Sequence, residues 1–201
     1  MIAVVDYGMG NLRSVEKAFT FLGFDARVTA DKQILRDASH IVLPGVGAIA
    51  DAVRHLEERG FVEEIQKQAA SGKPFLGICL GMQLLFDKSY ENGEYDALGL
   101  IPGEVKPFEL ADMRVPHMGW NSLIVNDNRL FVDAGKEKYV YFVHSYHADN
   151  VPEEYIIAKT NYGYDFVSAV QKENIYGLQF HPEKSGETGL AMLQSFGGLK
   201  L

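Results

Sequence analysis

Apolar residues in the first half of the chain alternate between two spacings. A short run rich in β-branched residues, IAVVD at residues 2–6, predicts a buried strand. Leu12, Val15 and Phe19 then recur at helical spacing, and Gly23 is a plausible end for that helix. The alternation predicts a mostly parallel sheet with helices on both faces. We expect further strands at residues 25–30, 40–47 and 73–78 and helices at residues 48–60, 61–72 and 80–89.

The second half of the chain has a different pattern, in which strand-like runs follow one another and are joined by short polar turns. These runs predict antiparallel strands that extend or cap the sheet. They lie at residues 121–125, 138–148, 154–160, 165–171 and 174–180, and a last helix is expected at residues 187–198. No repeat or linker interrupts the sequence. We therefore expect a single α/β domain over residues 1–201.

Composition narrows the class of protein. Hydrophobic residues make up 47% of the 201 residues and charged residues 23%, which is a globular composition. A net charge of −8 argues against nucleic acid or an anionic membrane as the main partner. The only cysteine, Cys79, cannot form an intramolecular disulfide, and the N-terminus lacks the basic region of a signal peptide. No apolar run reaches the length of a membrane span. We expect a cytoplasmic protein.

Two motifs suggest a cofactor or a metal only weakly. DYGMGN at residues 6–11 follows a strand and opens a helix, as a dinucleotide-binding turn does, but Arg13 stands where that fingerprint has its third glycine. His144 and His147 are a poor metal pair, because residues three apart on a strand point to opposite faces and no third ligand is evident. We expect neither cofactor nor metal.

Cys79 lies in GICLG, between a predicted strand and a predicted helix. This spacing is typical of a nucleophile elbow, in which a sharp turn leaves no room for a Cβ two residues before or after the nucleophile. The turn would expose the thiol at the carboxyl end of the sheet and aim the first helix amides, such as the Leu80 N–H, at the atom under attack. From this motif alone, Cys79 could equally be a small buried hydrophobic residue of the core.

A thiol nucleophile needs a base, and His181 is the best candidate among six histidines. A strand-like run leads directly into His181, Pro182 and Glu183, and the fixed φ of Pro182 ends the strand there. A carboxylate two residues from a histidine can hold the tautomer of the ring. An ordinary strand-ending turn is the alternative. Together with Cys79, the motif predicts a Cys-His-Glu catalytic set.

Three motifs in this order resemble the class I glutamine amidotransferases, Cys-His-Glu enzymes that release ammonia from glutamine. They are PGVGA at residues 44–48, GICLGMQLLF at 77–86 and QFHPEKS at 179–185. The resemblance runs from the first strand to the last helix and implies the flavodoxin-like fold of that family. It also implies that Cys79 forms a γ-glutamyl thioester, that His181 transfers the protons and that Glu183 orients His181.

The resemblance extends to further residues of the site. It implies an oxyanion site made by Leu80 together with Val46 and Gly47, the last two in a loop that the family reorients on binding its partner. It implies contacts to glutamine from Gly45, Gln83, Ser145 and Tyr146.

Within the family, the sequence most resembles the glutaminase subunits of imidazole glycerol phosphate synthases, which act in histidine biosynthesis. VVDYGMGNLRSV at residues 4–15, PHMGWN at 116–121 and YFVHSYH at 141–147 carry this resemblance. It implies a heterodimer with a (β/α)8-barrel cyclase subunit that receives the ammonia. Residues expected at that interface are Asn11, Trp120, Asn121 and Lys184, although Trp120 is as compatible with a core position and Lys184 with a solvated one.

Two other functions remain open at this point. The chain could be the glutaminase subunit of another synthase, for anthranilate, aminodeoxychorismate or pyridoxal phosphate. It could also be a non-catalytic interaction module that kept the fold.

Overall fold

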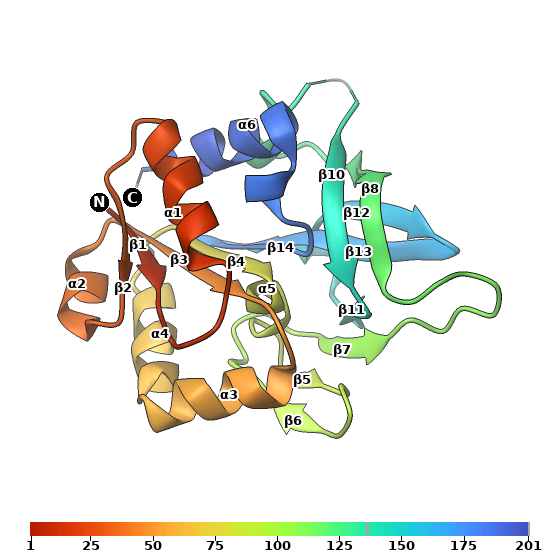
Figure 1. Ribbon diagram of the computed structural model, residues 1–201, viewed down its shortest axis with the longest axis horizontal. Coiled ribbons are helices and arrows are strands. Elements are labelled where there is room, and N and C mark those ends of the chain that lie inside the picture. The colour runs from red at the N-terminus through yellow and green to blue at the C-terminus, as the bar shows by residue number, and fades with distance from the viewer. Residues whose placement is uncertain (136, 201) are drawn as a thin grey trace.

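The first half of the chain folds as its apolar spacing predicts, with strands and helices in alternation (Figure 1). The structure is a computed structural model that describes residues 1–135 and 137–200. Its α-helices are α1 (Leu12–Phe21), α2 (Lys32–Asp37), α3 (Ile49–Glu58), α4 (Phe61–Ala69), α5 (Leu80–Gln83) and α6 (Gly186–Gly197). The strands of this part are β1 (Ile2–Val5), β2 (Ala26–Thr29), β3 (His40–Gly45) and β4 (Phe75–Cys79).

The second half is mostly β-structure. Its strands are β5 (Lys88–Ser89), β6 (Tyr95–Asp96), β7 (Glu104–Pro107), β8 (His117–Ser122), β9 (Ile124–Val125), β10 (Tyr139–His144), β11 (Tyr146–Asp149), β12 (Ile156–Tyr162), β13 (Tyr164–Lys172) and β14 (Ile175–Leu178). Three short 3-10 helices are η1 (Arg129–Phe131), η2 (Glu153–Tyr155) and η3 (Pro182–Lys184).

The main sheet begins with five parallel strands in the order β2-β1-β3-β4-β14. This is the flavodoxin-like order, in which ligands bind beyond the carboxyl ends of the strands. Antiparallel strands β13, β11 and β7 extend the sheet on the β14 side. The expected mostly parallel α/β sheet with antiparallel additions is confirmed.

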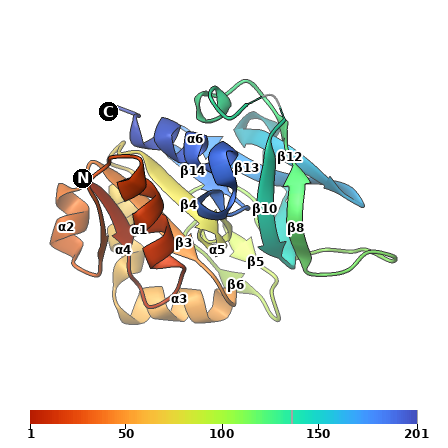
Figure 2. The same ribbon diagram turned by 45° about the horizontal axis from the view of Figure 1, so that its top comes forward.

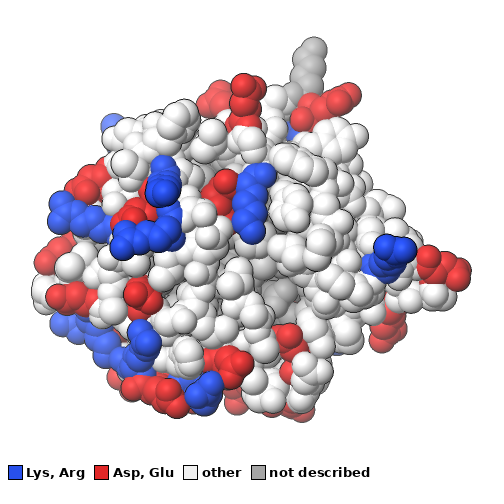
Figure 3. All heavy atoms as spheres, in the orientation of Figure 1, with Lys and Arg blue, Asp and Glu red and all other residues white. Residues whose placement is uncertain are grey.

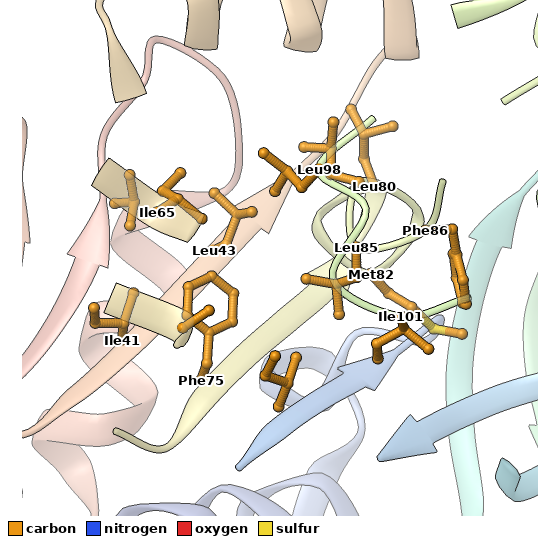
Figure 4. Packing of buried hydrophobic residues seen from close by; sticks show 14 of the residues in the cluster. Ile41, Leu43, Ile65, Phe75, Leu80, Met82, Leu85, Phe86, Leu98 and Ile101 are labelled. Atoms are coloured by element: carbon orange, nitrogen blue, oxygen red, sulfur yellow. The ribbon is translucent and has the colours of Figure 1, made fainter. Parts of the chain in front are cut away.

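Helices cover both faces of the parallel strands (Figure 2). One face packs on α2, α3, α4 and α5, and Figure 4 shows Leu43, Ile65 and Phe75 together in that core. The other face packs on α1 and α6 through Phe19 and Phe196, which lie 6.2 Å apart between ring centres. Burial on both faces explains why these strands read as continuous apolar runs.

Strands β8 and β10 form a separate antiparallel ribbon, which lies beside the antiparallel end of the main sheet (Figure 1). Alternate residues of the ribbon face opposite ways. Val140 and Phe142 are buried in the core, while Met118 and Trp120 are exposed. One face of the ribbon is therefore part of the core and the other is open.

The structure corrects two expectations around residues 80–107. The expected helix over residues 80–89 ends at Gln83, because the carbonyls of Leu84, Leu85 and Phe86 accept hydrogen bonds from the backbone of residues 98–101. Residues 88–107, for which the sequence predicted no strand, form β5, β6 and β7.

Three further expectations differ from the structure. Helix α2 was not expected; its first turn is capped by Asp31, whose side chain accepts from the Gln33 N–H at 2.7 Å. Strand β14 was expected to be antiparallel, but it lies parallel to β4 as the fifth strand of the parallel group. The strand expected at residues 121–125 begins earlier, since β8 starts at His117.

Candidate active site

Cys79 occupies a strained backbone turn between β4 and α5. Its φ is 56° and its ψ is −112°, a conformation that L residues other than glycine rarely adopt. Such strain costs on the order of 1–3 kcal/mol and is found mostly at functional sites. The turn brings Cys79 to the carboxyl end of the parallel strands, with the α5 amides starting at Leu80.

The glycines on either side of Cys79 are required by close backbone contacts. A Cβ on Gly77 would lie 2.5 Å from the Gly81 carbonyl oxygen, and a Cβ on Gly81 would lie 1.8 Å from the Leu43 carbonyl oxygen. Both distances are shorter than any real carbon–oxygen contact. The steric explanation of the GICLG spacing is confirmed.

Cys79 opens onto a cavity of about 320 Å³. The cavity walls come from the loop after β3, from α5, from the loop after β5, from the residue before β8, from the β10–β11 turn and from the segment after β14. The lining residues are Val46, Gly47, Cys79, Leu80, Gln83, Glu91, Pro116, Val143, His144, Ser145, Tyr146 and His181. A larger hollow of about 580 Å³ lies by Asn128, Gln171 and Tyr176, near the amino ends of β4 and β14, and no cysteine, serine or histidine of the described residues lines it. The smaller cavity is the candidate active site, because Cys79 and His181 both line it.

His181 lies in this cavity with a buried carboxylate behind it. Its Nδ1 is 2.9 Å from Glu183 Oε1, and the two side chains are 2% and 0% exposed. Burial alone would lower the pKa of His181, but the Cys79 and Glu183 side chains outweigh it and raise that pKa to about 9. His181 therefore holds a proton at neutral pH, with its Nε2 buried and unpartnered within the described residues.

The His181 backbone is tied to the ribbon. Its N–H donates to the Tyr141 carbonyl at 2.9 Å, and the Ser185 hydroxyl accepts from the Tyr141 N–H at 3.0 Å. Strand β10 thus positions His181 from outside the main sheet.

The expected oxyanion and glutamine-binding residues reach the site to different degrees. Val46, Gly47 and Leu80 line the cavity, and so do Gln83, Ser145 and Tyr146. Gly45 does not line it. Gly45 is buried at the end of β3, where a Cβ would meet the Tyr7 hydroxyl at 2.6 Å. The roles of these residues remain predictions.

The sequence did not predict Glu91, the one carboxylate that lines the cavity among the described residues. Its Oε2 accepts from the Ile49 N–H at the start of α3, at 2.8 Å. Glu91 lies in a polar loop without periodicity, so neither helical nor strand spacing marks it. Only the fold brings it to Cys79.

The four residues expected at a partner interface separate into two groups. Asn11 lies against the His181–Glu183 pair, since its amide nitrogen is 3.3 Å from Glu183 Oε1. Trp120 is 57% exposed on the open face of the ribbon. Lys184 lies beside it, with Nζ 5.9 Å from the centre of the Tyr141 ring. Asn121 faces inward and donates to the Asn161 carbonyl at 2.9 Å.

His144 and His147 were expected to point to opposite faces, but both rings pack against Phe108, at 5.1 and 4.7 Å between ring centres. The break at Ser145 between β10 and β11 explains this, because the two histidines belong to different strands. Within the described residues, no group of three possible metal ligands comes together. In the same part of the chain no helix is long and apolar enough to cross a bilayer.

Known proteins match this chain along its whole length. The family model for class I glutamine amidotransferases matches residues 3–197. The imidazole glycerol phosphate synthase subunit HisH of Sulfurimonas denitrificans is 50% identical over 200 residues, with 98% of this chain and 97% of that protein covered. The subunit of the same name from Geobacter metallireducens is 50% identical over 202 residues, with 97% and 96% covered.

Solved structures share the fold at lower identity. One described as a glutamine amidotransferase has a TM-score of 0.78 at 21% identity, with 99% of this chain and all of that chain covered. PurLQS from Thermotoga maritima has a TM-score of 0.73 at 24% identity, with 97% and 96% covered.

Proposed function

Because this chain belongs to the class I glutamine amidotransferase family, we propose that Cys79, His181 and Glu183 convert glutamine to glutamate and ammonia. The chain functions as the glutaminase subunit of imidazole glycerol phosphate synthase, in histidine biosynthesis, as its relatives at about 50% identity do. The observation that carries the mechanism is that the strained Cys79 opens onto the same cavity as the buried His181, whose Nδ1 lies 2.9 Å from Glu183 Oε1.

The first half-reaction makes the thioester. The Cys79 sulfur attacks the side-chain carbonyl carbon of glutamine, and the negative charge on the carbonyl oxygen develops near the start of α5 and the loop of Val46 and Gly47. His181 gives its proton to the departing nitrogen, which leaves as ammonia. Glu183 stabilises the charged ring before this transfer and keeps Nδ1 protonated after it.

The second half-reaction regenerates the enzyme. Neutral His181 takes a proton from water, the hydroxide adds to the thioester carbon, and the carbon–sulfur bond breaks with its electron pair left on sulfur. One water is consumed, and glutamate leaves with Cys79 and His181 in their starting states.

The cavity suits the amino-acid end of glutamine. Glu91 offers a carboxylate to the α-ammonium group, and the loop of Ser145 and Tyr146 offers backbone and hydroxyl groups to the α-carboxylate. Gln83 also lines the cavity, and its Nε2 donates to the Tyr146 backbone carbonyl at 3.1 Å. This set distinguishes free glutamine from a peptide, since both charged ends need a partner.

The ribbon is the proposed docking surface for the cyclase subunit. Trp120 lies opposite Tyr141 and Met118 opposite Val143, so apolar pairs cover its open face. Figure 3 shows few charged side chains over this region, in contrast to the helical side of the molecule. An exposed apolar surface of this kind marks a protein partner. Ammonia also needs a sheltered path, because in water at neutral pH it becomes ammonium, which is not nucleophilic. A heterodimer with a (β/α)8-barrel cyclase in the cytoplasm meets both requirements.

A Cys79→Ala variant tests the proposal in the complex. It should lose glutamine-dependent synthesis of imidazole glycerol phosphate and keep synthesis from added ammonium salts. Full glutamine-dependent synthesis by the variant would refute the proposed role of Cys79. Purification with a chorismate-using enzyme in place of the cyclase would favour the anthranilate or aminodeoxychorismate alternative.

A further inference from the structure

Gln179 is a buried amide to which the mechanism above gives no role. It lies two residues before His181 and has no exposed surface. A buried amide is costly unless its oxygen and nitrogen both find hydrogen-bond partners. The Gln179 side-chain nitrogen lies 4.0 Å from Cys79 Sγ.

The contacts of Gln83 determine which end of the Gln179 amide faces the sulfur. Gln83 Nε2 donates to the Tyr146 backbone carbonyl at 3.1 Å, and a carbonyl can only accept. The same nitrogen lies 3.0 Å from Gln179 Oε1, so that atom is the oxygen of the Gln179 amide. The NH2 group of Gln179 is left facing Cys79.

Two buried histidines fix the carbonyl on which this assignment rests. His144 Nδ1 donates to the Tyr146 carbonyl at 2.8 Å, and His144 Nε2 lies 2.9 Å from His117 Nδ1. His144 therefore accepts at Nε2 from a His117 that donates at Nδ1. Each group between His117 and Gln179 has one orientation, and the Gln179 N–H is held toward the sulfur before any substrate binds.

We propose that Gln179 is a further catalytic residue, which donates an amide N–H to Cys79 Sγ and stabilises the anionic sulfur. The inference rests on the glutaminase function proposed above. The other neighbour of the sulfur is the Val143 carbonyl, at 3.9 Å, which accepts from a neutral thiol but repels a thiolate. Gln179 offsets that repulsion. Hydrogen bonds to charged groups are shorter and stronger than neutral ones, so this contact should tighten when the sulfur loses its proton.

The sulfur is negatively charged twice in one turnover, before it attacks glutamine and when the thioester carbon–sulfur bond breaks. An N–H held toward it favours both steps. Gln179 lines no part of the glutamine cavity, so its loss should reduce kcat rather than raise KM.

A Gln179→Met variant tests the inference, because methionine matches glutamine in length and offers no N–H donor. Alkylation of Cys79 by iodoacetamide, at a fixed pH in the whole chain, should slow about tenfold, the effect of one hydrogen bond to a charged group. In the complex, kcat for glutamine should fall by a similar factor, with KM changed less than about threefold. Ammonium-dependent synthesis should stay at the parental rate.

The control is Ser168→Ala. Ser168 lies on the neighbouring strand β13, and its buried hydroxyl has no hydrogen-bond partner among the described residues. Ser168→Ala should leave alkylation and kcat unchanged. Gln179→Asn, whose amide is one methylene too short to reach Sγ, serves as the second variant should methionine prevent folding. Parental alkylation rates in a folded Gln179 variant would overturn the inference and leave the glutaminase function standing. A parent complex that does not hydrolyse glutamine would overturn the function, while alkylation would still report on Gln179.

Discussion

The Asn11 side-chain amide donates a hydrogen bond to Glu183 Oε1 at 3.3 Å, joining residues 172 positions apart in the chain. The same oxygen accepts from His181 Nδ1. Asn11 precedes α1, beyond the carboxyl end of β1, and contacts the carboxylate that is bonded to His181. If His181 and Glu183 act as proposed, Asn11 helps to position Glu183.

Asn11→Ala should therefore weaken catalysis rather than binding. A hydrogen bond to a charged group contributes about 1.5 kcal/mol, so kcat for glutamine should fall about tenfold with KM nearly unchanged. Steady-state kinetics in the cyclase complex measure this. Arg13→Ala, which alters an exposed ion pair on the same helix, is the control. If Asn11→Ala bound the cyclase more weakly but kept the parental kcat at saturating cyclase, Asn11 would act at the interface instead.

Trp120→Ala should weaken docking of the cyclase. Loss of an exposed tryptophan from the centre of an interface typically costs about 2 kcal/mol, so Kd should rise roughly thirtyfold, while the thermal midpoint of the isolated chain should not fall. Titration calorimetry measures the affinity. Phe21→Ala is the matched control, because Phe21 is 78% exposed on α1, away from the ribbon. Equal affinities for the parent and Trp120→Ala would exclude the ribbon as the docking surface.

Gly81→Ala should destabilise the elbow by overpacking. Its φ is not positive, so the whole effect comes from a Cβ placed 1.8 Å from the Leu43 carbonyl oxygen. We expect a loss of about 2–3 kcal/mol in the free energy of unfolding, measured by urea denaturation. Gly23→Ala tests backbone strain without overpacking, because Gly23 has a φ of 86° and open space around it. That variant should lose only about 1 kcal/mol. Equal losses would contradict the steric explanation.

The buried histidine pair should make the fold sensitive to mild acid. Burial lowers the pKa of His117 to about 4 and the pKa of His144 to about 3. An unfolded histidine titrates near 6.5, so the unfolded chain binds more protons over the interval between. The free energy of unfolding should therefore fall as the pH drops from about 6.5 to 4, by roughly 3 kcal/mol for His117.

Urea denaturation at pH 7 and pH 4.5 measures this fall. His117→Gln removes one titrating ring and keeps a side chain that can donate to His144, so its stability should change less between the two pH values. A fall as large as that of the parent would show that His117 is not the acid-sensitive group.

Local sequence rules predicted the parts of the site that lie within one motif. The glycines around Cys79 reflect backbone clearance, and the Pro182 strand end places Glu183 against His181, so both could be derived from short stretches. Glu91 could not, because its loop has no periodicity and only tertiary packing brings it to the cavity.

Other differences arise where tertiary contacts replaced local preference. The apolar run after Gln83 has helical composition, yet its carbonyls bond to residues 98–101 and the helix ends. The contact between Asn11 and Glu183 arises where the end of β1 approaches the turn after β14, which no local pattern predicts. Contacts between distant segments cannot be read from spacing alone.

The most direct test of the central claim is rapid-quench mass spectrometry of the cyclase complex during glutamine turnover. One γ-glutamyl adduct should form before glutamate is released, and it should be confined to the peptide that contains Cys79. Cys79→Ala should show neither the adduct nor glutamate. If Cys79→Ala released glutamate at the parental rate and the parent showed no adduct, the proposed thioester at Cys79 would be contradicted.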